Sequence, residues 1–262
     1  MNTIRFHKNQ SVIFSVEDWF AIAPPKKGAK HWVDGRSAKE LAKAWFPQKG
    51  QPQVPEELRQ LLDSCPQTEG FVFLEGLPEH QVRLDNFGGE TRNTDLVLLG
   101  YTGKQQKAVV SIEAKADEPF DVTITQRLKT GRARQGSNVP QRIELLCQAI
   151  FGSSPDTTPA LGELRYQLLT GVAGALIETQ NRKAALALFV VHEFRSGKVR
   201  PENLLANSND WLNFVRLLPT CADAMPEDGK LVGPIHVPGG IYVPSGVPLY
   251  VGKAVRDLAT CL

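Results

Sequence analysis

The sequence predicts an α/β protein with a mixed central β-sheet flanked by helices. Apolar runs rich in Val, Leu and Ile at 95–99, 108–115 and 184–194 have the composition and length of buried strands. The stretches 37–46 and 160–179 carry apolar residues at helical spacing. Helices that accompany apolar strands bury one face against the sheet, which produces a layered α/β architecture.

Length and composition are those of an ordinary globular protein. The chain has 262 residues, of which 42% are hydrophobic and 22% are charged, with a net charge of +2. We expect a single domain over 1–262. Residues 1–30 would form an N-terminal segment, and the Gly/Pro-rich residues 220–262 would form a C-terminal extension packed on the domain.

The cysteines and the N-terminus bear on location. Cys65, Cys147, Cys221 and Cys261 are scattered without a CxxC pair, which argues against a zinc site and for free thiols. The N-terminus lacks the apolar core of a signal peptide, and no apolar run approaches the roughly 20 residues that cross a bilayer. We therefore expect a cytoplasmic protein that has no membrane partner.

Residues 95–115 predict a β-hairpin that carries charged residues at its end. Side chains alternate along a strand, so Glu113 and Lys115 share one face. A hairpin centred near Lys104 pairs Asp95 with Glu113, because their residue numbers average 104. Two carboxylates at close range repel unless a cation lies between them, and hard oxygen ligands select Mg²⁺ or Mn²⁺.

Asp95 followed by Glu113-Ala114-Lys115 on an apolar strand resembles the signature of the PD-(D/E)XK nuclease superfamily, which has the restriction-endonuclease-like fold. Thr94 stands where the family name has proline. The resemblance implies a divalent-metal-dependent nuclease that hydrolyses phosphodiester bonds, with DNA favoured over RNA. Asp95 and Glu113 would then bind Mg²⁺ or Mn²⁺, and Lys115 would support the attacking water.

Two alternatives stay open at this point. The E-x-K pattern is common by chance, and a surface hairpin would carry Glu113 and Lys115 as solvated side chains. A nucleic-acid-binding or partner-binding module could keep the nuclease fold without turnover. The charges end an otherwise apolar strand, where burial without partners is costly, and this favours a built site.

The helix at 37–46 offers a further acidic residue. Ser37 and Glu40 have the spacing of a capping box, in which Glu40 supports the start of the helix. The family resemblance offers another role, because the helix before the sheet often supplies an acidic metal ligand there. Glu40 is therefore our candidate for a third metal ligand.

The segment 122–142 is strongly basic and contains no acidic residue. Its glycines suggest a flexible middle, so it could follow a phosphate backbone, act as a lid, or be a solvated loop. The predicted nucleic-acid-binding residues are Arg127, Lys129, Arg132, Arg134 and Arg142. The earlier loop around Lys26 and Lys27 is also basic and offers either a phosphate contact or a solvated surface. A homodimer or a partner protein would suit cleavage of both strands of a duplex.

The apolar helix predicted over 160–179 carries two polar residues of interest. Tyr166 and Gln167 lie on it, and the resemblance implies that a Gln or Tyr on this helix can lie near the active site. Gly171 and Gly174 would allow the helix to approach the sheet closely. His192, near the end of the strand at 184–194, is interpreted as a structural histidine.

Overall fold

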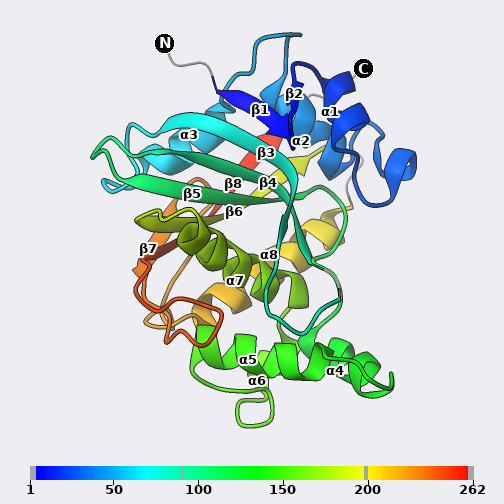
Figure 1. Ribbon diagram of the computed structural model, residues 1–262, viewed down its shortest axis with the longest axis vertical. Helices are drawn as coiled ribbons and strands as arrows, with labels where there is room; N and C mark the ends of the chain where they lie inside the picture. Colours follow the sequence, from blue (N-terminus) through cyan, green and yellow to red (C-terminus); the bar gives the residue numbers. More distant parts are fainter. Residues whose placement is uncertain (1–3, 90, 198–199, 259–262) are drawn as a thin grey trace.

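The computed structural model describes residues 4–89, 91–197 and 200–258. Within these ranges, eight strands form one mixed sheet in the order β2-β1-β3-β4-β5-β6-β8-β7 (Figure 1). The strands are β1 (Arg5–Lys8), β2 (Ser11–Ile13), β3 (Val72–Val82), β4 (Arg92–Tyr101), β5 (Lys107–Lys115), β6 (Leu186–Arg195), β7 (Leu231–Ile235) and β8 (Leu249–Asp257). The helices are α1 (Val16–Ile22), the 3₁₀ helix η1 (Gly28–His31), α2 (Ser37–Trp45), α3 (Glu56–Asp63), α4 (Ile124–Arg132), α5 (Val139–Phe151), α6 (Ala160–Glu163), α7 (Tyr166–Asn181) and α8 (Pro201–Leu217).

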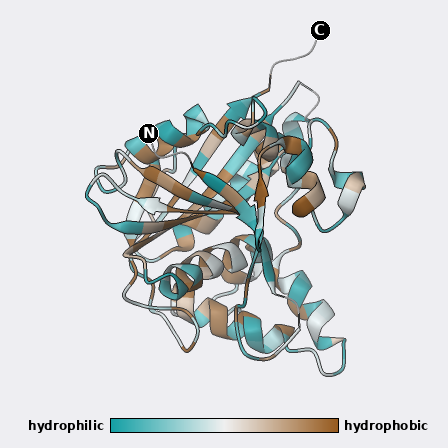
Figure 2. Ribbon diagram, turned by 45° about the horizontal axis from the view of Figure 1, so that its top comes forward, coloured by the Kyte–Doolittle hydropathy of each residue, from teal (hydrophilic) through white to brown (hydrophobic). Residues whose placement is uncertain are grey.

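Helices cover both faces of the sheet, so the predicted α/β class with a mixed central sheet is confirmed. One core contains buried side chains of α4, α5, α7 and α8 with one face of β6 and β8. A second core contains those of α1, α2 and α3 with the opposite face. Figure 2 shows hydrophobic residues along the central strands and mixed hydrophobic and hydrophilic bands on the helices.

The centre of the sheet combines an antiparallel and a parallel part. Strand β4 pairs antiparallel with both β3 and β5. Strand β6 then pairs parallel with β5 and with β8. The predicted strand at 184–194 is therefore central, as β6. The first nine of its ten residues, up to Phe194, are buried. The β4–β5 hairpin thus has buried neighbours on both sides.

The sequence also predicts two separate strands at 71–77 and 80–87, but the structure has the single strand β3 in their place. The chain stays extended through Pro78, because β4 pairs with β3 on both sides of this proline, Leu77 with Val97 and His80 with Thr94. The polar, Gly-containing residues 88–94 predict a turn that leads to Asp95, and this turn ends earlier than expected, since β4 begins at Arg92. In this predicted turn the sequence offers Glu90 and Arg92 as residues that could face the site, and Glu90 lies outside the described residues.

Three helical predictions are corrected. The basic segment 122–142 is not a flexible loop, since α4 begins at a capping box of Thr123 and Gln126, and α5 follows it. The helix expected over 160–179 is interrupted by extended backbone at Leu164 and Arg165, which separates α6 from α7. The sequence also predicts a short helix at 210–218, which in the structure is the C-terminal part of α8, a helix of 17 residues.

The Gly/Pro-rich C-terminal part is more integral than an extension. Strand β7 lies at the edge of the sheet, but β8 is inserted between β6 and β7. Leu249, Val251 and Ala254 of β8 are completely buried. The N-terminal segment likewise adds β1 and β2 to the other end of the sheet. None of the helices in the described ranges is long and apolar enough to span a membrane.

Candidate active site

The β4–β5 hairpin has the register that the sequence predicts. Leu96 pairs with Ile112 and Tyr101 with Lys107. The next position of the same register places Asp95 opposite Glu113. Ile112 and Ala114 pack into the core formed with α1, α2 and α3. Since side chains alternate along β5, Glu113 and Lys115 point to the opposite face, which α7 covers.

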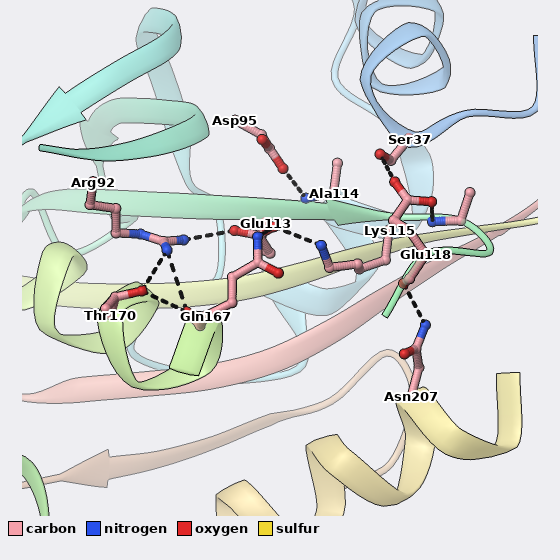
Figure 3. A network of polar contacts seen from close by, with 11 residues as sticks. Ser37, Arg92, Asp95, Glu113, Ala114, Lys115, Glu118, Gln167, Thr170 and Asn207 are labelled. Atoms are coloured by element: carbon pink, nitrogen blue, oxygen red, sulfur yellow. Dashed lines mark hydrogen bonds and ion pairs between the residues drawn. The ribbon is translucent and has the colours of Figure 1, made fainter. Parts of the chain in front are cut away.

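Glu113 is the centre of a buried ion network (Figure 3). Its Oε2 accepts a hydrogen bond of 2.7 Å from Nη2 of Arg92, and its Oε1 accepts one of 2.9 Å from Nζ of Lys115. The exposed fraction is 1% for the Glu113 side chain and 6% for each cationic side chain. Burial of three charges is costly, so the mutual pairing is what makes this arrangement tolerable.

Helix α7 supplies the remaining contacts of the network. The Nε2 atom of Gln167 donates to Oε1 of Glu113, and Oγ1 of Thr170 accepts a hydrogen bond of 2.9 Å from Arg92 (Figure 3). A Cβ atom at Gly174 would lie 3.1 Å from Cδ of Arg92, and one at Gly171 would lie 3.3 Å from its Nη2. The two glycines therefore let the arginine lie flat against the helix. The structure brings Gln167 into contact with Glu113, on the helix where the family resemblance implies such a residue.

The charges of the network shift its pKa values in opposite directions. Burial would raise the pKa of Glu113, but Lys115 and Arg92 outweigh it and hold the value below its usual range. Burial would lower the pKa of Lys115, but Glu113 and Asp95 outweigh it and hold the value above its usual range. Glu113 is therefore a carboxylate and Lys115 an ammonium at neutral pH.

Asp95 differs from Glu113 because, within the described ranges, no cationic side chain is hydrogen-bonded to it. Its Oδ2 accepts a hydrogen bond of 2.8 Å from the backbone N–H of Ala114. Burial, followed by the negative charges of Glu113 and Glu79, raises its pKa well above the usual range, and Lys115 offsets only part of this. A negative charge on Asp95 is thus less well compensated by the protein than the charge on Glu113.

Glu79 is a site residue that our sequence reasoning missed. On β3, Pro78 pairs with Leu96 and His80 with Thr94, so Glu79 lies across from Asp95. Its backbone has a φ of 50°, its side chain accepts a hydrogen bond from Asn93, and burial raises its pKa to about 7. The strands predicted at 71–77 and 80–87 leave this position between them, although a carboxylate two positions from an apolar strand was a usable signal.

The donor set fits a divalent cation held by two carboxylates. Burial, and then repulsion by Glu113 and Glu79, raises the pKa of Asp95, and a cation next to Asp95 and Glu113 would relieve the repulsion. In the described ranges, no three His, Cys, Asp or Glu side chains are grouped to hold a metal ion by themselves. Mg²⁺ needs only one or two protein carboxylates, because water and substrate phosphate complete its coordination.

Glu40 is not brought to this site. It is buried on α2, where its Oε1 accepts hydrogen bonds of 2.8 Å from the N–H of Gly35 and 3.0 Å from Nζ of Lys43. Helix α2 packs into the core on the other face of the sheet. The expected third metal ligand is therefore wrong for this structure, and the residue stabilises the start of the helix. Ser37 does not complete the capping box, because its hydroxyl donates to Glu118 instead.

A basic cavity of about 480 Å³ opens beside the ion network. Of the predicted nucleic-acid-binding residues, Arg127 and Arg142 line it, and Arg134 lines the neighbouring depression. Lys129 and Arg132 line neither. The cavity lining consists of Lys26, Lys27, Leu84, Thr91, Arg92, Asn93, Asp121, Arg127, Arg142, Tyr166, Gln167 and Thr170.

His192 belongs to a separate, structural cluster. Its Nε2 lies 2.6 Å from Oε1 of Glu57, which also pairs with Arg256 at 2.7 Å. The imidazole is completely buried, and this burial lowers its pKa. The interpretation as a structural histidine agrees with these contacts.

The fold and the site define an α/β protein with a buried carboxylate and lysine network at the edge of a basic cavity. The family model described as "Domain of unknown function (DUF6946)" matches residues 13–258, so the chain belongs to this family. No curated protein and no solved structure matches the chain.

Proposed function

We propose that the protein is a divalent-metal-dependent nuclease that hydrolyses phosphodiester bonds, with DNA favoured over RNA, and that its sheet is restriction-endonuclease-like. The observation that carries this proposal is Glu113, buried between Lys115 and Arg92, with the poorly compensated carboxylate of Asp95 beside it. The resemblance of Asp95 and Glu113-Ala114-Lys115 to the PD-(D/E)XK signature supports the same chemistry. The basic cavity at the network supports a polyanionic substrate.

Each residue has a role that follows from its charge. Asp95 and Glu113 would hold the cation. When bound, Mg²⁺ supplies Lewis acidity and lowers the pKa of a coordinated water. Lys115, whose pKa is raised, stays protonated and acts as a hydrogen-bond donor that orients the attacking water and stabilises negative charge on the phosphate. Arg92 and Gln167 are positioning residues, because they fix the Glu113 carboxylate from two sides.

One observation favours the alternative of a binding module without turnover. Both oxygens of Glu113 already accept hydrogen bonds from protein donors, Oε1 from Lys115 and Gln167, and Oε2 from Arg92. A carboxylate satisfied in this way is stable without a cation. In that case the basic cavity would bind nucleic acid and the network would only support the sheet.

A cleavage assay on supercoiled plasmid, single-stranded DNA and RNA separates these functions. Each substrate is incubated with Mg²⁺, with Mn²⁺ and with a chelator. A nuclease cuts at least one substrate in the presence of metal and none in the chelator, with DNA cut faster than RNA. The absence of cutting in both metals would support the binding module instead.

A further inference from the structure

The cavity beside Arg92 has the features of a site for one phosphate-bearing nucleotide unit. We propose that it binds the phosphate group of a nucleotide, with Arg92, Arg127 and Lys27 as its ligands. This inference rests on the proposed function and names the part of the substrate that lies next to the ion network.

The charge of the lining selects an anion. Among the described residues that line the cavity, five are cationic and Asp121 is the one acidic residue. The cations come from three distant parts of the chain: the loop before α2, strand β4, and the helices α4 and α5. Converging cations from separate elements raise the local potential more than one basic stretch does, and they favour phosphate.

Two of these cations offer buried donors that the protein leaves unused. In the part of the chain that the structure describes, Nε of Arg92 and Nε of Arg127 are buried and have no hydrogen-bond partner. The Arg92 side chain is only 6% exposed. An unpaired buried donor is costly, so a ligand gains affinity when a side chain turns its Nε–H group toward the cavity and the ligand accepts that hydrogen bond. Phosphate oxygens are strong acceptors for such N–H groups.

The two arginines of α4 and α5 have different roles in the cavity. Arg142 is engaged by Asp85, which it contacts through Nε and Nη2. The guanidinium of Arg127 lies 5.2 Å from the ring centroid of Tyr166, and this stacking orients it without using its N–H donors. Arg127 is therefore the side chain of this pair that remains able to bind a ligand.

Size and surroundings define the ligand further. A volume of about 480 Å³ suits a small molecule, so one nucleotide unit enters and a duplex does not. Two further depressions adjoin the cavity, one through Lys26, Thr91 and Asn93, and one through Arg127 and Arg142. A bound nucleotide could accordingly be the end of a strand or an internal unit of a strand that continues into both depressions.

Calorimetric titration of the full chain in a chelator tests this site without turnover. The ligands are inorganic phosphate, a 5′-mononucleotide, and a short single-stranded oligonucleotide with a 5′-phosphate or a 5′-hydroxyl. We expect Arg127→Gln and Lys27→Gln each to weaken binding of the mononucleotide about tenfold. The matched control is Lys104→Gln, which removes a positive charge from the loop between β4 and β5, outside the cavity lining, and should change affinity less than about twofold.

The oligonucleotides identify the source of the phosphate. Tighter binding of the 5′-phosphate form that is lost in Arg127→Gln supports a terminal phosphate in the cavity. Equal binding of both forms, with the same loss in Arg127→Gln, supports an internal phosphate. The inference is overturned if no ligand binds, or if Arg127→Gln and Lys27→Gln behave like Lys104→Gln with every ligand. Lys27 is exposed, so its variant remains informative even if Arg127→Gln disturbs the fold.

These titrations and the cleavage assay fail independently. Binding that depends on Arg127, with no cleavage in any metal, would contradict the proposed hydrolysis and leave the phosphate site standing. Cleavage that is unaffected by Arg127→Gln and Lys27→Gln would contradict the phosphate site and leave the proposed hydrolysis standing.

Discussion

The Nη2 atom of Arg92 donates a hydrogen bond of 2.7 Å to Oε2 of Glu113, and the two side chains are almost completely buried. The arginine begins β4, and the glutamate lies near the end of β5. Their contact therefore joins the two strands just beyond the last backbone pair of the hairpin, Leu96 with Ile112. It also fixes the orientation of the carboxylate that we propose to hold a metal ion.

Removal of Arg92 should destabilise the fold strongly. Arg92→Met leaves the buried Glu113 with Lys115 as its one cationic partner, and loss of one member of a buried pair costs about 3 kcal/mol of unfolding free energy. Urea denaturation measures this loss. Lys230→Ala is the control, because it breaks a pair with Glu227 whose side chains are 62% and 63% exposed, and it should cost less than about 1 kcal/mol. Equal losses in the two variants would argue against a stabilising contribution of the buried network.

Asp95→Asn should stabilise the metal-free protein while abolishing its response to Mg²⁺. Because the pKa of Asp95 is raised, its ionised form is disfavoured in the fold, and a neutral amide of the same shape removes this cost. Asparagine can still accept the hydrogen bond from Ala114. Mg²⁺ at about 100 times its Kd should stabilise the wild type by about 2.7 kcal/mol, seen as a higher Tm. An equal rise of Tm in Asp95→Asn would place the cation elsewhere.

Glu178 should make stability depend on acid pH. Burial would raise its pKa, but hydrogen bonds with His80 and Arg182 outweigh it and hold the value at about 2, against an ordinary 4.5. The unfolded chain therefore binds more protons in this window, so stability is complete above the ordinary value and is lost as the pH falls. Urea denaturation at about pH 6 and about pH 3 should differ by roughly 2 kcal/mol from this residue. The same difference in Glu178→Gln would show that other groups cause it.

Gly171→Ala should destabilise the contact of α7 with the sheet. The new Cβ would lie 2.5 Å from Cε2 of Phe189, which is completely buried on β6. Overpacking of this kind costs about 1–3 kcal/mol, and the better helix propensity of alanine returns at most about 1 kcal/mol. Gly246→Ala, where nothing lies within 4 Å, should change stability by less than about 0.5 kcal/mol. A neutral or stabilising Gly171→Ala would mean that the helix can move away from the strand.

The hairpin and its charges could be predicted from the sequence because they depend on local periodicity. Alternation along β5 places Glu113 and Lys115 on one face, and the hairpin centre sets the register with Asp95. That Gln167 could lie near the site was suggested by family resemblance and not by spacing. Its contact with Glu113 depends on how closely the helix approaches the sheet.

The rest of the site depends mainly on tertiary contacts, which leave little local signal in the sequence. In the sequence, Arg92 and Glu79 are flanked by residues that are typical of turns. Pairing of β3 with β4 overrides this turn tendency and keeps both residues in the sheet. The basic residues around Arg127 suggested a flexible loop, but packing of Gly131 against Val139 and the capping box at Thr123 stabilise helical structure there. Glu40 was assigned to the site by analogy, although its helix packs on the other face of the sheet.

The most direct test of the central claim is the Mg²⁺-dependent cleavage rate of Lys115→Met compared with Lys107→Met. Both lysines lie on β5, but Lys115 contacts Glu113, whereas Lys107 donates to the backbone oxygen of Arg182 at the other end of the strand. We expect Lys115→Met to lose at least about 100-fold in rate and Lys107→Met to retain wild-type activity, with both variants folded. Equal cleavage by Lys115→Met and the wild type would contradict a catalytic role for this network.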